Sequence, residues 1–323
     1  MSESQKPKRA SSRLHAALTL VLTLLVGAGF TLQFANDAAV RAEASQSPSV
    51  TATKTQSSNT PTLTGDPTPT DPDPQPDPIL EAIAAHQKAH GCNFNPAATT
   101  LHVLGTCKIL LVGDSIGNNL GYGMLGQIGR YPNLKFVLRA KASTGLSNSW
   151  FYNWETNLKN YLVAEKPDMV IVLLGANDRQ NIKIGNDIYT YGTAGWKRVY
   201  SESVARMAKL ATDAGAYIHW VGMPICKPYN YNKGMELISS LTRIELAKHS
   251  GTSFSQLHTL TADASGNYTQ YLTVNGVRTK VRGDDGIHFT APGQSVIGSY
   301  IIKRIYNVFH VNLKSSSPRV VTK

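Results

Sequence analysis

The segment KILLVGDSIG, at residues 108–117, places an apolar run directly before a polar, glycine-rich turn. Four of its first five residues are hydrophobic, which is typical of a strand that is buried on both faces of a sheet. The same order recurs at residues 168–178, DMVIVLLGAND, where a second apolar run leads into Gly-Ala-Asn-Asp. Both segments therefore predict a fully buried strand that ends in a cluster of polar residues.

The region around these two segments alternates apolar runs with helical patterns. Strands are predicted at 108–112, 134–138, 168–174, 217–221 and 252–257, and helices at 79–90, 118–128, 150–164, 196–214, 235–249 and 292–309. Residues 271–281 alternate around Asn275-Gly276, which predicts a hairpin. The alternation predicts an α/β fold with a central parallel sheet of about five strands, covered by helices on both faces.

The composition divides the chain into segments. Residues 79–313 are long enough for one well-buried core and are expected to form a single domain. Residues 45–78 hold 8 Pro and 13 Ser or Thr, too little apolar surface to offset the entropy of ordering, so they predict a disordered, extended linker. Residues 314–323 are polar and basic and are expected to form a tail.

Residues 1–44 predict that the chain is targeted to a membrane. A basic flank precedes residues 14–34, which contain no Asp, Glu, Lys or Arg and would span about 30 Å as a helix, one hydrocarbon thickness. Because the basic flank should stay in the cytoplasm, the rest of the chain is expected outside the cell membrane, tethered by a single-pass signal anchor. The alternative is a signal peptide cleaved after Ala42-Glu43-Ala44, which would release a secreted protein.

The charge and the sequence motifs exclude several classes of partner. Lys and Arg number 32 against 21 Asp and Glu, but they form no basic block, so we predict no nucleic-acid binding. The histidines show no metal-ligand spacing, and no metal is expected. Residues 121–126, GYGMLG, match the dinucleotide fingerprint, yet Arg139 and Lys141 stand where an acidic residue is needed. We therefore predict no nucleotide and no other cofactor.

Three polar clusters combine into one chemical pattern. Ser115 follows the first predicted strand, Asn177 follows the third, and Asp285 and His288 precede the last helix. The carboxyl ends of parallel strands share one edge of a sheet, and a serine that begins a helix lies among its backbone N–H donors. A spacing of three residues lets the carboxylate of Asp285 orient the imidazole of His288. A serine activated by a histidine that an aspartate orients is the constellation of acyl transfer.

Together with Gly145 after the second predicted strand, these blocks resemble the SGNH/GDSL hydrolase superfamily over residues 105–309, and especially a bacterial cell-envelope branch of it. The resemblance implies a flavodoxin-like three-layer α/β/α sandwich. It also implies that Ser115 is the nucleophile, that His288 is the general base and that Asp285 orients it. The oxyanion hole would consist of the backbone N–H groups of Ser115 and Gly145 and the side chain of Asn177.

The resemblance further implies an extracytoplasmic serine esterase or O-acyltransferase. Its substrate would be an acylated sugar or envelope polymer that carries ester groups, O-acetyl groups above all. The sequence does not distinguish hydrolysis from transfer to a sugar hydroxyl. A hypothesis from another class is a non-catalytic glycan-binding or scaffold module on the same fold.

Aromatic residues near the clusters receive two interpretations. Tyrosines in the loops after the third and fourth strands are expected to line the substrate site: Tyr189, Tyr191, Tyr229 and Tyr231. Three tryptophans are instead expected to pack in the core or against helices, with a rim that stacks on sugars as the alternative: Trp150, Trp154 and Trp196.

The three cysteines predict one disulfide. Cys92 and Cys107 bracket a loop of 14 residues in a domain that is expected to be exported, which favours a bond between them. Cys226 follows the fourth strand at its carboxyl end, whereas Cys107 precedes the first strand at its amino end. A strand length is well over the roughly 7 Å that a disulfide can bridge, so Cys226 is expected to be free.

Overall fold

The computed structural model describes residues 77–90, 92, 100–103, 106–131, 134–309 and 319–322. The apolar segment 14–34, the cleavage site at 42–44 and nearly all of the predicted linker lie outside these residues. No helix of the described part of the chain is long and apolar enough to cross a membrane.

Five parallel strands form the central sheet, in the order β3-β2-β4-β7-β8. Their bounds are Cys107–Gly113 for β2, Leu134–Ala140 for β3, Met169–Leu173 for β4, Tyr217–Gly222 for β7 and Thr252–Gln256 for β8. The predicted fold class is confirmed. The chain moves from β2 to one neighbour, β3, and then crosses to the other, β4, so the strand order reverses at β2. In open α/β sheets such a reversal opens a crevice at the carboxyl ends of the strands, where ligands bind.

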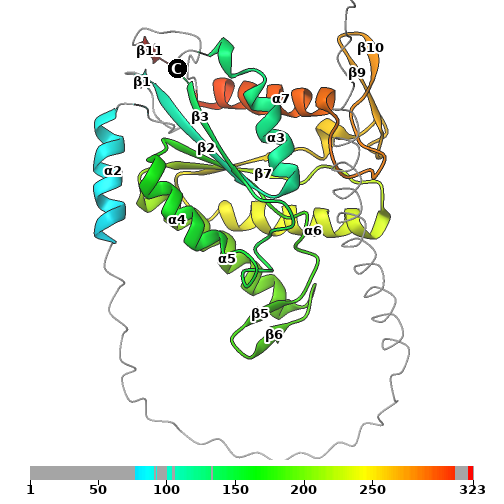
Figure 1. The fold of residues 1–323 in the computed structure, drawn as a ribbon, viewed down its shortest axis with the longest axis horizontal. Helices are drawn as coiled ribbons and strands as arrows, with labels where there is room; N and C mark the ends of the chain where they lie inside the picture. Colours follow the sequence, from blue (N-terminus) through cyan, green and yellow to red (C-terminus); the bar gives the residue numbers. More distant parts are fainter. Residues whose placement is uncertain are drawn as a thin grey trace, which may run out of the picture. The chain divides into compact units, whose positions relative to one another are not determined.

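Helices cover both faces of the sheet (Figure 1). One face carries α3 and α7, and the other carries α4, α5 and α6. Their bounds are Ser115–Leu125 for α3, Trp154–Glu165 for α4, Ala194–Asp213 for α5, Tyr229–Leu246 for α6 and Ala291–Phe309 for α7. A further helix, α2 (Pro78–His90), packs beside α4 and α5. Short 3-10 helices lie at η1 (Ile128–Arg130) and η2 (Thr259–Thr261).

Gly123, in the middle of the GYGMLG segment, serves the contact between α3 and α7, and Gly121 faces the side chain of Leu138 on β3. A Cβ atom on Gly123 would lie 1.8 Å from the carbonyl oxygen of Gln294, and one on Gly298 would lie 2.6 Å from the carbonyl oxygen of Gly123. The two helices can approach this closely only because both positions lack a side chain. Helix packing therefore accounts for the glycine at position 123.

Three antiparallel pairs stand outside the main sheet. The predicted hairpin forms from β9 (Tyr271–Val274) and β10 (Val277–Lys280), and both turn residues, Asn275 and Gly276, have positive φ. Two other pairs were not predicted: β5 (Ile182–Ile184) with β6 (Asp187–Tyr189), and β1 (Thr100–Val103) with β11 (Arg319–Thr322). Part of the predicted polar tail is thus a strand.

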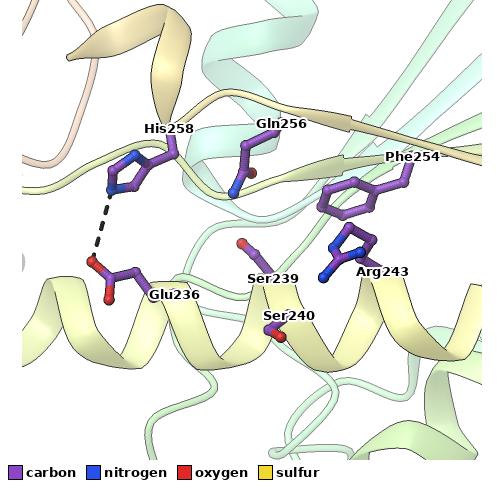
Figure 2. Close-up of a pocket in the computed structure, with 7 residues that line it drawn as sticks. All are labelled: Glu236, Ser239, Ser240, Arg243, Phe254, Gln256 and His258. Atoms are coloured by element: carbon purple, nitrogen blue, oxygen red, sulfur yellow. Dashed lines mark ion pairs between the residues drawn. The ribbon is translucent and has the colours of Figure 1, made fainter. Parts of the chain in front are cut away.

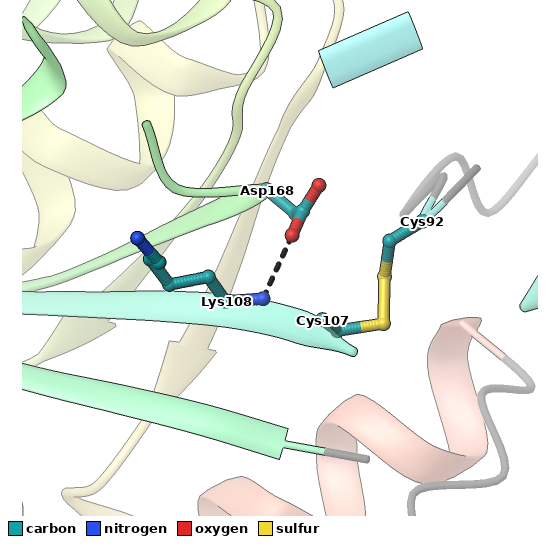
Figure 3. Close-up of a disulfide and its surroundings, with 4 residues drawn as sticks. All are labelled: Cys92, Cys107, Lys108 and Asp168. Atoms are coloured by element: carbon teal, nitrogen blue, oxygen red, sulfur yellow. Dashed lines mark hydrogen bonds between the residues drawn. A yellow bond between two sulfur atoms is a disulfide. The ribbon is translucent and has the colours of Figure 1, made fainter. Parts of the chain in front are cut away.

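A disulfide joins Cys92 to Cys107 at the start of β2, with 5.6 Å between the two Cα atoms (Figure 3). Beside it, the backbone N–H of Lys108 donates to Oδ2 of Asp168 at 2.7 Å. Cys226 is free and buried. The disulfide and the hydrogen bond both fix the amino end of β2, at the end of the strand opposite to Ser115.

Candidate active site

Ser115 is the first residue of α3 and follows β2 with one residue between them. That residue, Asp114, caps the helix: its Oδ1 accepts hydrogen bonds from the backbone N–H groups of Ile116 at 2.9 Å and Gly117 at 3.3 Å. The helix therefore begins three residues earlier than the sequence pattern predicted. The cap makes the strand-to-helix turn sharp and leaves the N–H of Ser115 in the first helical turn, where it has no intrahelical partner.

The other oxygen of Asp114 connects two loops of the site. Oδ2 accepts hydrogen bonds from the backbone N–H groups of Gly175 at 3.1 Å and Ala176 at 2.9 Å, which follow β4. Asp114 is fully buried; burial raises the pKa of its carboxyl, while the four N–H donors act in the opposite direction. This role of Asp114 was not predicted, although its place in Gly-Asp-Ser was a signal. It fixes the turn of Ser115 against the loop that carries Asn177.

His288 lies between a serine and a carboxylate. Its Nε2 is 2.9 Å from Oγ of Ser115, and its Nδ1 is 2.6 Å from Oδ2 of Asp285. Oδ1 of Asp285 accepts the backbone N–H groups of Ile287 at 2.9 Å and His288 at 3.0 Å. Burial alone would raise the pKa of Asp285, but these hydrogen bonds and the charge of His288 bring it down to about 2. Asp285 is therefore ionised at neutral pH and can orient a neutral imidazole or stabilise an imidazolium.

The adjacent carboxylate, Asp284, belongs to the surface. Its side chain is 88% exposed, and its Oδ1 accepts from Nζ of Lys280 at 2.7 Å and from Nε2 of Gln270 at 2.9 Å. The hydrogen bond from Lys280, with that of Gln270, lowers its pKa. Of the two neighbouring aspartates, only Asp285 contacts His288.

Two residues predicted for the oxyanion hole, Asn177 and Gly145, already make hydrogen bonds within the protein. Nδ2 of Asn177 donates to the carbonyl oxygen of Thr144 at 2.9 Å, which anchors the amide and leaves its second N–H directed elsewhere. The backbone N–H of Gly145 is not open, because it donates to Oδ1 of Asn148 at 2.8 Å. The role of Gly145 stays a prediction, and it requires the side chain of Asn148 to turn away or to share this N–H with the substrate oxygen. The backbone N–H of Ser115 and the second N–H of Asn177 remain the other two predicted donors.

The loop around Gly145 rests on a second buried carboxylate, Asp178. Its Oδ1 accepts the backbone N–H of Ser147 at 2.8 Å, and its Oδ2 accepts the hydroxyl of Tyr200 at 3.1 Å. A Cβ atom on Gly145 would lie 2.1 Å from Oδ1 of Asp178, so only glycine fits there. Burial, together with the charge of Asp114, raises the pKa of Asp178 to about 6. Asp178 belongs to the Gly-Ala-Asn-Asp motif, but this role was not predicted from it.

The four tyrosines that were predicted to line the substrate site have different surroundings. Tyr229, at the start of α6, is 73% exposed. The hydroxyl of Tyr231 donates to the carbonyl oxygen of Ala176 at 2.7 Å, so this side chain supports the Asn177 loop from within. The two others lie beside α5: Tyr191 is edge-on to Trp196, and the ring of Tyr189 lies under the guanidinium of Arg198.

The tryptophans divide between the two environments that the sequence left open, and Trp150 is not in the core. Trp154 and Trp196 are buried, as the sequence predicted. Trp150 is 76% exposed, and its neighbour Phe151 is 48% exposed. The physical reason is the helix boundary: Asn153 caps α4 by accepting the N–H of Thr156, so the helix begins at Trp154 and leaves Trp150 in the loop that follows Gly145.

A polar groove of about 280 Å³ lies between α6 and the end of β8 (Figure 2). Its lining includes Arg243, Phe254 and Gln256, and Nε2 of His258 lies 3.8 Å from Oε1 of Glu236. None of Ser115, Asp285 and His288 lines this groove. Within the described ranges, no group of three or more His, Cys, Asp or Glu side chains is placed to hold a metal ion.

Residues 108–304 match the family model described as "Protein of unknown function (DUF459)", and the chain belongs to this family. The sheet order and the meeting of the sequence blocks at one edge agree with the resemblance to SGNH/GDSL hydrolases. No curated protein sequence matches the chain.

Solved structures of similar fold are distant in sequence. A lipase/acylhydrolase from Enterococcus faecalis is 15% identical, with a TM-score of 0.45, over 62% of this chain and 96% of its own. The esterase EstA from Pseudoalteromonas sp. is also 15% identical, with a TM-score of 0.45, over 63% and 99%. A GDSL-like lipase from Bacteroides thetaiotaomicron is 14% identical, with a TM-score of 0.44, over 71% and 97%. At this distance the function is inferred from the site itself.

Proposed function

We propose that this protein is a serine hydrolase of the esterase type that works through an acyl-enzyme on Ser115. The observation that carries the proposal is the continuous hydrogen-bonded chain from Asp285 through His288 to Oγ of Ser115, with distances of 2.6 Å and 2.9 Å. A nucleophile, a base and an orienting carboxylate at these distances form the arrangement that acyl transfer needs.

In the first half-reaction, Oγ of Ser115 attacks the ester carbonyl carbon while its proton passes to Nε2 of His288. The carbonyl oxygen takes up the negative charge, and the N–H of Ser115 and the second N–H of Asn177 donate to it. The ionised Asp285 stabilises the imidazolium. The bond to the alcohol then breaks, the alcohol leaves with the proton of His288, and Ser115 carries the acyl group.

The second half-reaction removes the acyl group from Ser115. His288 takes a proton from an incoming hydroxyl, whose oxygen attacks the acyl carbon, and the proton returns to Oγ of Ser115 as the ester bond breaks. When the hydroxyl belongs to water, the product is a carboxylic acid. When it belongs to a sugar, the product is a new ester, and the protein acts as an O-acyltransferase.

The substrate that we propose is an O-acylated, above all O-acetylated, carbohydrate of the cell envelope. Trp150 and Phe151 expose aromatic surface in the loop that follows Gly145, and Tyr229 does so at the start of α6, on the side of the sheet where the strands end. Aromatic rings in such positions can stack on the apolar faces of sugars. The location outside the cytoplasm, with residues 14–34 as a membrane anchor, remains part of the proposal. The disulfide between Cys92 and Cys107 supports it, because disulfides persist in oxidising compartments.

The test compares the wild type with Ser115→Ala. A fluorophosphonate probe should label the wild type on Ser115, as located by mass spectrometry, and a chromogenic acetyl ester should be hydrolysed. Both activities should disappear in Ser115→Ala, while the thermal unfolding curve stays that of a folded protein. Ester hydrolysis that survives in Ser115→Ala would refute the proposal.

A further inference from the structure

The hydrogen bond between Asp285 and His288 fixes the imidazole only within its own loop. The two residues are three positions apart, so their bond travels with the loop. Ser115 lies on α3, 173 residues away in sequence. A second connection is needed to hold this loop at a constant distance from α3.

Asn119 makes that connection. It lies four residues after Ser115 on α3, and side chains at this spacing share one face of a helix. Its Oδ1 accepts the backbone N–H of Phe289 at 2.9 Å, and Phe289 directly follows His288. The helix that carries Ser115 is therefore bonded to the backbone beside His288 by a contact that is independent of the reacting atoms.

Arg282 supports the same loop from its other side. This arginine is buried, and its Nη2 donates to the carbonyl oxygens of Ile287 at 2.7 Å and Gly286 at 3.3 Å. Its guanidinium carbon lies 4.3 Å from the centre of the Phe289 ring. Phe289 is thus held by its backbone on α3 and by its ring on Arg282. Because the loop is fixed internally, its distance from Ser115 is set by the bond to Asn119 together with the packing of α7 on α3.

We propose that Asn119 is a positioning residue for the reaction. It accepts the N–H of Phe289 and so keeps Nε2 of His288 within hydrogen-bond reach of Oγ of Ser115. This inference rests on the proposed function and adds a residue that touches neither the substrate nor the reacting atoms. Small displacements are costly in such a geometry, since a misplacement of about 1 Å can lower a rate by about a hundredfold.

The test uses three variants on α3: Asn119→Ala, Asn119→Asp and Asn118→Ala. Asn119→Ala removes the acceptor and should lower kcat on an acetyl ester by about 10- to 100-fold, with KM little changed, because the substrate still binds. The rate of fluorophosphonate labelling of Ser115 should fall by a similar factor. Asn119→Asp keeps an oxygen that accepts the N–H of Phe289 and should recover most of the labelling rate. Asn118→Ala is the matched control, since its partly buried side chain does not hold the loop, and it should label like the wild type.

The outcomes separate this inference from the proposed function. Wild-type protein that is not labelled on Ser115 would overturn the proposed function itself. Wild type that is labelled, together with Asn119→Ala that is labelled and turns over equally fast, would overturn the role of Asn119 alone. The role of Asn119 would also be overturned if Asn118→Ala lost as much of the labelling rate as Asn119→Ala, or if Asn119→Asp did not recover it. Either result would assign the loss to a disturbance of α3 as a whole.

Discussion

The carboxylate of Asp285 lies 2.6 Å from Nδ1 of His288, and its second oxygen holds the backbone N–H of the same histidine at 3.0 Å. The ring and its backbone are thus bound by one side chain. This arrangement fixes Nδ1 as the protonated nitrogen and leaves Nε2 to accept the proton of Ser115.

Replacement of the two neighbouring aspartates should have unequal effects. Asp285→Asn should lower kcat by about 10³–10⁴ with the fold intact, because an amide can favour the wrong tautomer and does not stabilise the imidazolium. Asp284→Asn should cost less than about tenfold, since it removes only an exposed ion pair with Lys280. Steady-state kinetics on a small acetyl ester measure both. A larger loss in Asp284→Asn would move the orienting role to Asp284.

The pH dependence should reflect His288 rather than Asp285. The pKa of Asp285 is about 2, so this carboxylate stays ionised in any practical assay. A protonated imidazole cannot accept the proton of Ser115, so kcat/KM should rise from acidic to neutral pH and then reach a plateau. The profile of kcat/KM against pH checks this expectation. Activity that falls as the pH rises from acidic to neutral would be incompatible with His288 as the base.

The oxyanion donors can be tested through Asn177. Asn177→Ala should lower kcat by about 10²–10³ and change KM little, because its amide donates to an oxygen that is charged only in the transition state. Asn148→Ala should have a much smaller effect or raise kcat, because it frees the N–H of Gly145 that Asn148 now occupies. Near-normal turnover in a folded Asn177→Ala protein would remove Asn177 from the mechanism.

The features of the site that could be predicted are those that a short stretch of sequence determines. An apolar run followed by Gly-Asp-Ser places Ser115 at the end of a strand, and a spacing of three residues pairs Asp285 with His288. The cross-loop bonds of Asp114 and Asp178 depend on distances between neighbouring strand ends, which no local pattern contains. The same holds for the bond from Phe289 to Asn119.

The predicted helix boundaries were wrong where a capping side chain, and not the periodicity of hydrophobic residues, determines the first residue of the helix. Asp114 starts α3 three residues early, and Asn153 starts α4 late enough to expose Trp150. The strands β5 and β6 have only three residues each, too few for alternation to be recognised. Thr100 pairs with Thr322, more than two hundred positions away, and only the folded chain brings them together.

The location of the domain can be tested with intact spheroplasts. If residues 14–34 anchor the chain and residues 79–313 lie outside, external protease should cut within 45–78 and release a soluble, fluorophosphonate-reactive fragment. Membrane-free supernatant analysed by immunoblot measures the release. Release without added protease would favour the cleaved signal peptide, and a chain that the protease cuts only after the spheroplasts are lysed would place the domain in the cytoplasm.

The last prediction concerns Asp178 and the stability of the fold. Its pKa in the folded protein is about 6 against an ordinary value of 3.8, chiefly because it is buried. Between these values the folded state keeps a proton that the unfolded chain has lost, so this carboxyl makes the free energy of unfolding fall as pH rises. His219, whose pKa burial lowers to about 4, acts in the opposite direction over nearly the same range and masks the effect in the wild type.

The free energy of unfolding of Asp178→Asn should therefore be compared with that of the wild type at each pH, because the pH dependence of the variant alone does not isolate the effect of Asp178. Asparagine can still accept the N–H of Ser147, and its amide can donate to the hydroxyl of Tyr200, so the loop around Gly145 should keep its shape. Urea unfolding from about pH 4 to about pH 7 should show the variant gaining stability relative to the wild type as pH rises. Asp284→Asn is the control, because its exposed carboxylate is ionised throughout that range. A difference between Asp178→Asn and the wild type that does not change with pH would show that Asp178 is ionised in the folded protein.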